Sequence, residues 1–175
     1  FIFHQHSTPA EISKVASLLA EGKDLVLVTD AGTPGIADPG GKLIADLIKI
    51  MPELEVIALP GPNAAAASLS ISGFPTNEFV FLGFPPHKKG RQTFFKKMSS
   101  IESTIVFYES VHRMVKTLEQ IKSEELFRDR LLVMTRELTK KFETVYRGTA
   151  AEILAKLSAE EQRGEFTIVI GPLDR

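Results

Sequence analysis

Two short segments of the chain combine acidic and basic side chains directly after an apolar run. The first is Tyr108-Glu109-Ser110-Val111-His112-Arg113, and the second is Thr135-Arg136-Glu137-Leu138-Thr139-Lys140. Isolated charges are costly to bury, so charged groups at the ends of buried strands need partners. The pattern therefore predicts either an ion-pair network between loops or a polar cleft that positions a substrate.

A further carboxylate, Asp30, follows the apolar run 25–29 and precedes the small residues Ala31 and Gly32. Such a carboxylate can accept hydrogen bonds from a ligand hydroxyl or ammonium group, and the small residues let a ligand approach the backbone closely. An aspartate can equally close its own turn through backbone N–H groups. From the residues alone, a ligand contact and a simple turn both stay open.

The stretch 79–101 is basic, because it holds five lysines and arginines and no acidic residue. Three phenylalanines, Phe84, Phe94 and Phe95, are interleaved with them. Basic residues beside aromatic rings suit an RNA backbone and stacked bases. The alternative is a solvated helix face whose apolar side belongs to the core.

Charge is also uneven on a larger scale. Residues 1–78 carry four lysines against nine acidic residues, whereas residues 79–175 carry 17 basic against 13 acidic residues. A shift of this kind indicates a domain boundary and a polyanionic partner for the basic side.

The composition of the 175 residues excludes several classes of protein. With 43% hydrophobic and 25% charged residues and a net charge of −1, the chain is not intrinsically disordered. The absence of cysteine excludes disulfides, thiolate zinc sites and a cysteine nucleophile. No apolar run approaches the roughly 20 residues that cross a bilayer, so we expect no membrane span. The pair His4 and His6 lacks a third ligand at a recognised spacing, so we expect no metal site.

The elements that must position these side chains alternate between strand and helix in the first half. Residues 25–29 and 55–59 are continuous apolar runs, as expected for strands buried on both faces of a parallel sheet. A capping box, Thr8-Pro9-Ala10-Glu11, starts the first of three helical patterns. The alternation predicts a parallel sheet covered by helices, with loops 30–41 and 60–63 at the carboxyl ends of its strands, where ligands bind.

The second half predicts a mixed sheet. Its strands are expected at residues 79–83, 104–108, 131–135, 142–147 and 166–170. Residues 142–147 alternate apolar and polar side chains, which is typical of an antiparallel, half-exposed strand. A second capping box, Thr149-Ala150-Ala151-Glu152, starts the last helix.

Several segments together resemble one known family. In chain order they are Thr29-Asp30-Ala31-Gly32-Thr33-Pro34, Asp38-Pro39-Gly40, Leu59-Pro60-Gly61-Pro62-Asn63-Ala64, Gly83-Phe84, the segments at 108–113 and 136–140, and Gly164-Glu165-Phe166; His4-Gln5-His6 matches a further segment. They resemble the bacterial type I 2′-O-ribose methyltransferases of small-subunit ribosomal RNA, within the tetrapyrrole methylase superfamily.

The resemblance implies a tetrapyrrole-methylase-like fold of two α/β domains, the first with a mostly parallel sheet and the second with a mixed sheet. It implies S-adenosylmethionine as cofactor, a cytidine ribose of the small (30S) subunit RNA as substrate, no metal for methyl transfer, a homodimer and a cytoplasmic location. The residues that it places around the cofactor are Asp30, Ala31, Gly32, Thr33, Asn63, Ala64, Tyr108, Met134, Thr135, Phe166 and Thr167.

Roles in catalysis follow from the same resemblance. Methyl transfer to a hydroxyl benefits from a general base or a positioning acceptor. The candidates in the matched segments are Glu109, Glu137 and His112. Arg113, Arg136 and Lys140 of the matched segments are expected to bind RNA phosphates. The basic stretch 79–101 adds Lys88, Lys89 and Arg91 as expected phosphate ligands. Two other functions stay open, a tetrapyrrole methylase and a non-catalytic RNA-binding protein.

The family begins with a Gly/Pro-containing strand and loop that precede any segment matched here. Phe1-Ile2-Phe3 is neither an initiator methionine nor a signal peptide, so we expect an N-terminally truncated chain. We expect residues 1–77 to be the remainder of the first domain, with the cofactor loops, and residues 78–175 to be the second domain.

Overall fold

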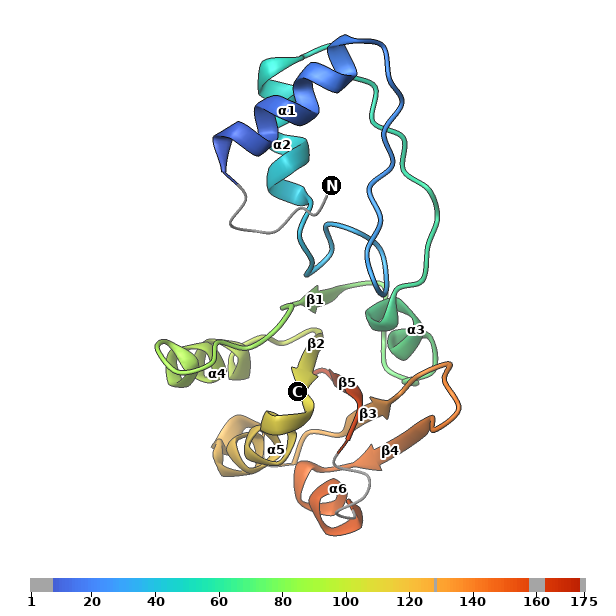
Figure 1. Ribbon diagram of the computed structural model, residues 1–175. Helices are drawn as coiled ribbons and strands as arrows, with labels where there is room; N and C mark the ends of the chain where they lie inside the picture. Colours follow the sequence, from blue (N-terminus) through green and yellow to red (C-terminus); the bar gives the residue numbers. More distant parts are fainter. Residues whose placement is uncertain (1–7, 128, 158–162, 174–175) are drawn as a thin grey trace. The chain divides into compact units, whose positions relative to one another are not determined.

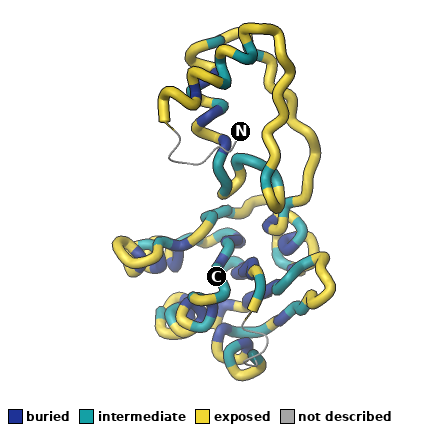
Figure 2. Tube along the Cα trace, viewed as in Figure 1, coloured by how far each residue is buried: buried dark blue, intermediate teal, exposed yellow. Residues whose placement is uncertain are grey.

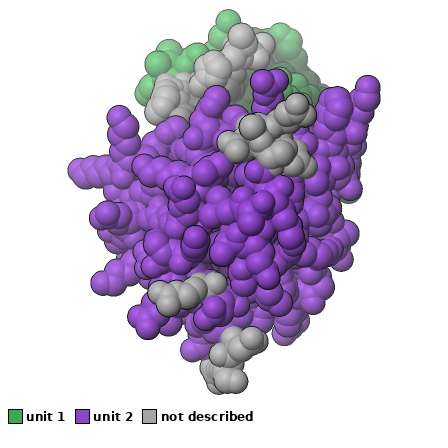
Figure 3. All heavy atoms as spheres, turned by 90° about the horizontal axis from the view of Figure 1, so that it is seen from below, with its two compact units in different colours: residues 1–63 green, residues 64–175 purple. Residues whose placement is uncertain are grey.

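The computed structural model describes residues 8–127, 129–157 and 163–173. The chain separates into two compact units, Phe1–Asn63 and Ala64–Arg175, which Figure 3 distinguishes by colour. We call them unit 1 and unit 2 and describe each separately. The domain boundary expected near residue 78 stays a prediction, because the two units are defined by packing within this chain alone.

Unit 1 contains two helices, α1 (Pro9–Ala20) and α2 (Gly41–Ile50), which pack on each other. The predicted capping box is confirmed, since the Thr8 hydroxyl accepts from the Glu11 N–H while the Glu11 carboxylate accepts from the Thr8 N–H. Ile12 of α1 and Leu43 and Leu47 of α2 form a small buried cluster. The apolar residues of the two helices therefore face one another.

The strands predicted at 25–29 and 55–59 are wrong. Both segments run as extended chain without strand assignment and are largely exposed, as Figures 1 and 2 show. Val26 is 75% exposed and Ile57 is 71% exposed, although both lie in apolar runs. A strand requires a neighbour that completes its hydrogen-bond ladder, and the described residues of unit 1 form no such ladder. Hydrophobicity alone therefore did not show whether these segments have the partners that a buried strand needs.

Unit 2 is built on a five-stranded sheet. Its strands are β1 (Phe79–Phe81), β2 (Thr104–Ser110), β3 (Leu132–Arg136), β4 (Thr144–Gly148) and β5 (Glu165–Ile170). Their order across the sheet is β1-β2-β5-β3-β4, with β1 parallel to β2 and the other pairs antiparallel. This confirms the mixed sheet and the antiparallel strand that the alternation at 142–147 predicts.

Helices cover both faces of this sheet. On one face lie α4 (Arg91–Ser99), α5 (Met114–Ser123) and α6 (Ala150–Lys156), and they form the main core with Phe107 and Ile168 of the sheet. On the other face, α3 (Ala64–Ser70) packs against Val106, Val133 and Val169. Two short 3₁₀ turns, η1 (Val111–Arg113) and η2 (Glu125–Phe127), flank α5. Because side chains alternate along a strand, the two clusters use alternate residues of the same strands.

A buried arginine joins the end of the sheet to the loop before β2. The Arg130 guanidinium donates hydrogen bonds to the carbonyl oxygens of Gly171 (2.8 Å from Nε), Ile101 (3.0 Å) and Ser103 (3.3 Å). Burial lowers the pKa of Arg130 to about 10, since desolvation disfavours the charged form. Its side chain therefore satisfies three backbone acceptors that come from two separate segments of unit 2.

We expect Arg130→Met to lower the free energy of unfolding by about 2–4 kcal/mol, because it leaves buried carbonyl groups without a donor. Urea unfolding followed by circular dichroism measures the change. The matched control is Lys122→Met, which removes an exposed cation from α5. Equal stability of the two variants would contradict the assigned role of Arg130.

Candidate active site

The carboxyl ends of β1, β2 and β3 lie at the same edge of the sheet of unit 2, together with the start of β5. Ser110 of β2 pairs with Glu165 of β5, and the Glu137 N–H donates to the Glu165 carbonyl over 2.9 Å. The structure thus brings the motifs at 108–113, 136–140 and 164–166 together. We call Ser110, Arg136, Glu137, Lys140 and Glu165 the polar edge.

Glu109 lies just inside this edge and is completely buried. One carboxylate oxygen contacts Arg113 over 2.8 Å and accepts from the Ser110 N–H over 2.7 Å. The other oxygen accepts from the Thr117 hydroxyl over 2.6 Å and from Arg91 over 3.4 Å. Both oxygens are therefore occupied, and the side chain is 0% exposed. This geometry favours an anchoring role for Glu109 over the general-base role expected from sequence.

The same network changes the interpretation of two arginines. Arg91 also donates to Thr117, to Gln120 and to the Pro86 carbonyl. Its guanidinium carbon lies 4.9 Å from the centre of the Phe95 ring. Arg113 donates to the Ser110 hydroxyl and the Pro85 carbonyl. In this structure neither guanidinium is available for the RNA phosphates expected from sequence, because a buried carboxylate needs both as partners. Thr117 completes the network, and no local pattern marked it in the sequence.

Glu137 is one of two carboxylates of the polar edge that solvent reaches, the other being Glu165, whose side chain is 71% exposed. Its Oε1 accepts from the Glu165 N–H over 2.8 Å and contacts Lys140 over 3.4 Å, and its side chain is 19% exposed. These contacts lower the pKa of Glu137, chiefly the hydrogen bond from the Glu165 backbone and then the one from Lys140. Lys140 also contacts the Glu165 carboxylate over 2.8 Å, and this bond raises the pKa of Lys140. Glu137 is therefore an ionised hydrogen-bond acceptor whose position is fixed by Glu165 and Lys140.

The backbone around Glu137 is unusual. Glu137 has a φ of 48°, in the left-handed region. The neighbouring Gly164 has a φ of +101°, and a Cβ there would lie only 2.6 Å from the Cγ and Oε1 of Glu137. A side chain at residue 164 would collide with Glu137, which explains on steric grounds why the matched motif has glycine at this position.

The remaining candidates for catalysis and phosphate binding lie on the surface. His112 is exposed on η1. Arg136 donates to the carbonyl oxygens of Arg163 (2.6 Å) and Phe142 (3.1 Å), which ties the β3 end to two loops. Lys88 and Lys89 are exposed in the loop before α4. Their predicted contacts with RNA stay predictions.

The two loops of unit 1 that are predicted to contact the cofactor are joined to each other by a hydrogen bond. The Thr33 hydroxyl donates to the Pro62 carbonyl over 3.0 Å, and a Cβ on Gly61 would lie 3.1 Å from the same hydroxyl oxygen. Asp30, Ala31 and Gly32 are exposed, and Gly32 has a φ of +75°. An exposed carboxylate beside open backbone suits a ligand with hydroxyl and ammonium groups, so these residues fit S-adenosylmethionine. Asn63, the last residue of unit 1, is half-buried.

The predicted cofactor residues of unit 2 divide between the two faces of the sheet. Tyr108, Thr167 and Thr135 form one row across β2, β5 and β3 on the α3 face. The Tyr108 hydroxyl accepts from the Ala65 N–H of α3 over 3.2 Å, and Thr135 shares a 2.8 Å hydrogen bond with Ser68. Ala64 begins α3 and is exposed.

Met134 and Phe166 point to the opposite face and belong to the main core. Thr135 and Thr167 are likewise buried. Any cofactor contact at these four positions would therefore come from backbone atoms, and it stays a prediction. Ser68 was missed from the sequence, because its partner Thr135 lies 67 residues away.

Metal-ligand clusters and membrane-spanning helices are both absent from the described residues. No three histidine, cysteine or acidic side chains among them are grouped to hold a metal ion. Within the same described ranges, no helix has the length and apolar character needed to cross a membrane. His4 and His6 lie outside the described residues.

The fold and the matched motifs define a family. The sequence model of the tetrapyrrole (corrin/porphyrin) methylases matches residues 4–154, and the chain belongs to this family. A solved uroporphyrin-III C-methyltransferase from Thermus thermophilus, complexed with S-adenosyl homocysteine, has a similar fold. It aligns with a TM-score of 0.58 and 17% identity, covering 93% of this chain and 73% of that one.

Within the family, the chain is similar to curated proteins named ribosomal RNA small subunit methyltransferase I. It is 37% identical to the Bacillus subtilis protein, over 96% of this chain and 56% of that protein. It is 34% identical to the Thermotoga maritima protein, over 96% of this chain and 74% of that protein. The chain thus spans about half to three quarters of the length of these relatives. The resemblance seen in the short motifs is confirmed by nearly the whole sequence.

Proposed function

We propose that the protein is an S-adenosylmethionine-dependent methyltransferase that modifies small-subunit ribosomal RNA at the 2′-hydroxyl of a cytidine ribose. The observation that carries this proposal is the 34% identity to the Thermotoga maritima ribosomal RNA small subunit methyltransferase I across 74% of that protein. The exposed basic residues of unit 2 support a polyanionic substrate. The homodimer and the cytoplasmic location that the resemblance implies belong to the same proposal.

Residues of unit 1 are proposed to hold the cofactor. S-adenosylmethionine supplies a methyl group on a sulfonium when it is bound. The Asp30 carboxylate accepts hydrogen bonds from its hydroxyl or ammonium groups, and the backbone at Ala31 and Gly32 allows close approach. The hydrogen bond between Thr33 and Pro62 keeps the two loops in a fixed geometry, which limits the conformational entropy lost on binding.

Glu137 is proposed to orient the ribose hydroxyl. Its carboxylate is ionised at neutral pH and is fixed by Glu165 and Lys140. It can therefore accept a hydrogen bond from the ribose hydroxyl and hold that hydroxyl in one orientation. Correct orientation of reacting groups supplies several kcal/mol, about 7–11 in the best intramolecular systems. His112 is the exposed alternative at the same edge, because an imidazole can act as a general base.

The lowered pKa of Glu137 predicts a pH dependence of stability. A carboxyl group whose pKa is lower in the folded than in the unfolded state stabilises the fold above its unfolded pKa, and this stabilisation disappears as the pH falls through the folded pKa. We therefore expect wild type to be more stable than Glu137→Gln at pH 7, and the difference to shrink below about pH 4.5. Urea unfolding of both proteins across this range measures the effect. A difference that is independent of pH would contradict the assigned contacts.

The decisive test of function is a methyl-acceptor assay with radiolabelled S-adenosylmethionine. We expect transfer to small ribosomal subunits that lack the modification, and none to uroporphyrinogen. Transfer to uroporphyrinogen alone would support a tetrapyrrole methylase instead. Binding of RNA without calorimetrically detectable S-adenosylmethionine binding would support a non-catalytic RNA-binding protein.

A further inference from the structure

An open groove runs between α4 and α5 of unit 2. Its volume is about 1220 Å³, and it is lined by the loop before α4 and by the facing sides of the two helices. Small-molecule pockets typically enclose roughly 300–1,000 Å³, so this groove is larger and suits an extended ligand. We call it the basic groove for the residues described next.

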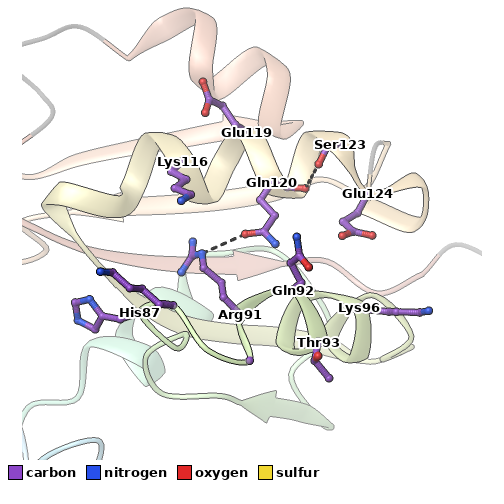
Figure 4. Close-up of a pocket in the computed structure, with 12 residues that line it drawn as sticks. His87, Arg91, Gln92, Thr93, Lys96, Lys116, Glu119, Gln120, Ser123 and Glu124 are labelled. Atoms are coloured by element: carbon purple, nitrogen blue, oxygen red, sulfur yellow. Dashed lines mark hydrogen bonds between the residues drawn. The ribbon is translucent and has the colours of Figure 1, made fainter.

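Hydrogen-bond donors dominate one end of the basic groove. His87 and Lys88 contribute from the loop, and Lys116 contributes from α5. Figure 4 shows Lys116 and Gln120 of α5 pointing toward Arg91 and Gln92 of α4. Ammonium and amide N–H groups recognise oxygen acceptors, and lysine is a general phosphate ligand.

Arg91 contributes to this site indirectly. Its Nε donates to the side-chain oxygen of Gln120 over 3.2 Å, so the amide nitrogen of Gln120, a donor, is turned to the groove (Figure 4). The Arg91 guanidinium itself is bonded to the buried Glu109 carboxylate, to Thr117 and to the Pro86 carbonyl. Arg91 is therefore a positioning residue of the groove wall, and not a phosphate ligand.

The positions of the acidic lining residues make the two ends of the groove differ in charge. Glu119 points away from the groove, and Glu124 lies at the end opposite His87 (Figure 4). Lys96 lies on the rim near that second end. A polyanion would be attracted to the end with His87, Lys88 and Lys116 and repelled at Glu124.

We propose that the basic groove binds the phosphodiester backbone of the RNA substrate through Lys88, Lys116 and the amide of Gln120. The proposal rests on the proposed function and extends it, because it assigns an RNA contact to α5, which the sequence did not indicate. These contacts are to the backbone, so they position the RNA without reading its sequence.

The test compares two double variants with the same change in charge. Lys88→Gln/Lys116→Gln alters the groove, whereas Lys97→Gln/Lys122→Gln alters exposed lysines of the same two helices that lie outside the described lining. Binding of a labelled fragment of small-subunit ribosomal RNA is measured by fluorescence anisotropy at several salt concentrations. We expect the groove variant to bind about tenfold more weakly, with the slope of log K against log salt reduced by about 1.5, since each lost phosphate contact removes about 0.7–0.9. We expect the control to change less than twofold.

Three results would overturn the proposal: equal effects of the two double variants, an unchanged groove variant, or a wild-type protein that does not bind the RNA. The methyl-acceptor assay separates this outcome from failure of the proposed function. Wild type that methylates small subunits, with a groove variant of unchanged RNA affinity, rejects the groove alone. Wild type that binds RNA through the groove but transfers no methyl group rejects the function alone.

Discussion

Glu109→Ala is expected to lower the free energy of unfolding by about 3–5 kcal/mol, which is the range for removing one partner of a buried ion pair. The variant leaves Arg91 and Arg113 with an uncompensated buried charge, because both contact this one carboxylate. It also removes the acceptor of the Thr117 hydroxyl and of the Ser110 N–H. Chemical unfolding monitored by circular dichroism measures the loss.

The control for this experiment is Glu125→Ala, which removes an exposed glutamate of η2. We expect it to change stability by less than about 0.5 kcal/mol, as is usual for surface substitutions. Glu109→Gln is expected to fall between the two, since it keeps the shape of the side chain but not its charge. A Glu109→Ala protein with wild-type stability and no methyl transfer would instead show that Glu109 acts in catalysis.

Glu137→Gln is expected to have the largest effect on the reaction. Removing a general base costs about 10²–10⁴-fold in rate. The amide oxygen of glutamine still accepts a hydrogen bond, but it is uncharged and too weakly basic to take up the hydroxyl proton. Because Glu137 is partly exposed, we expect stability at pH 7 to fall by only about 1 kcal/mol or less. Single-turnover methylation of small subunits, at saturating cofactor and substrate, measures the change in rate.

Two companion variants distinguish orientation from general disruption. Glu125→Gln makes the same chemical change at an exposed site and should keep the wild-type rate. Gly164→Ala keeps the glutamate at position 137 but displaces its side chain, because the new Cβ would lie 2.6 Å from Glu137 Oε1. We expect Gly164→Ala to reduce the rate as well. Full activity in Glu137→Gln would reject the assignment and leave His112 as the candidate.

Local patterns were sufficient for much of unit 2. The alternation at 142–147 correctly predicted β4 as antiparallel, and the Thr149 capping box is formed as expected. These features depend on residues that are close in sequence, so local rules apply to them. In unit 1 the same rules predicted buried strands at 25–29 and 55–59, and failed because burial of a strand depends on distant partners.

The sequence predicted which segments form the candidate site, but not the role of each residue within them. The motifs at 108–113 and 136–140 meet at one edge, as strands of one direction require. Glu109 and Glu137 look equivalent in the sequence, since each lies just after an apolar run in a segment that also contains an arginine. Only the tertiary structure separates them, because Arg91 lies 18 residues from Glu109 in the chain, and Glu165 lies 28 residues from Glu137.

The Glu109 network has a consequence for the shape of the groove beside it. Arg91 of α4 is bonded at once to Thr117 and Gln120 of α5 and to Glu109 of β2. The spacing of the two helices is thus set by an internal electrostatic crosslink rather than by the ligand. A groove of fixed width selects ligands by their shape. A polyanionic chain that does not fit this width therefore gains little binding affinity from the lysines along the groove. Loss of Glu109 would therefore relax selectivity among polyanions even where the fold survives.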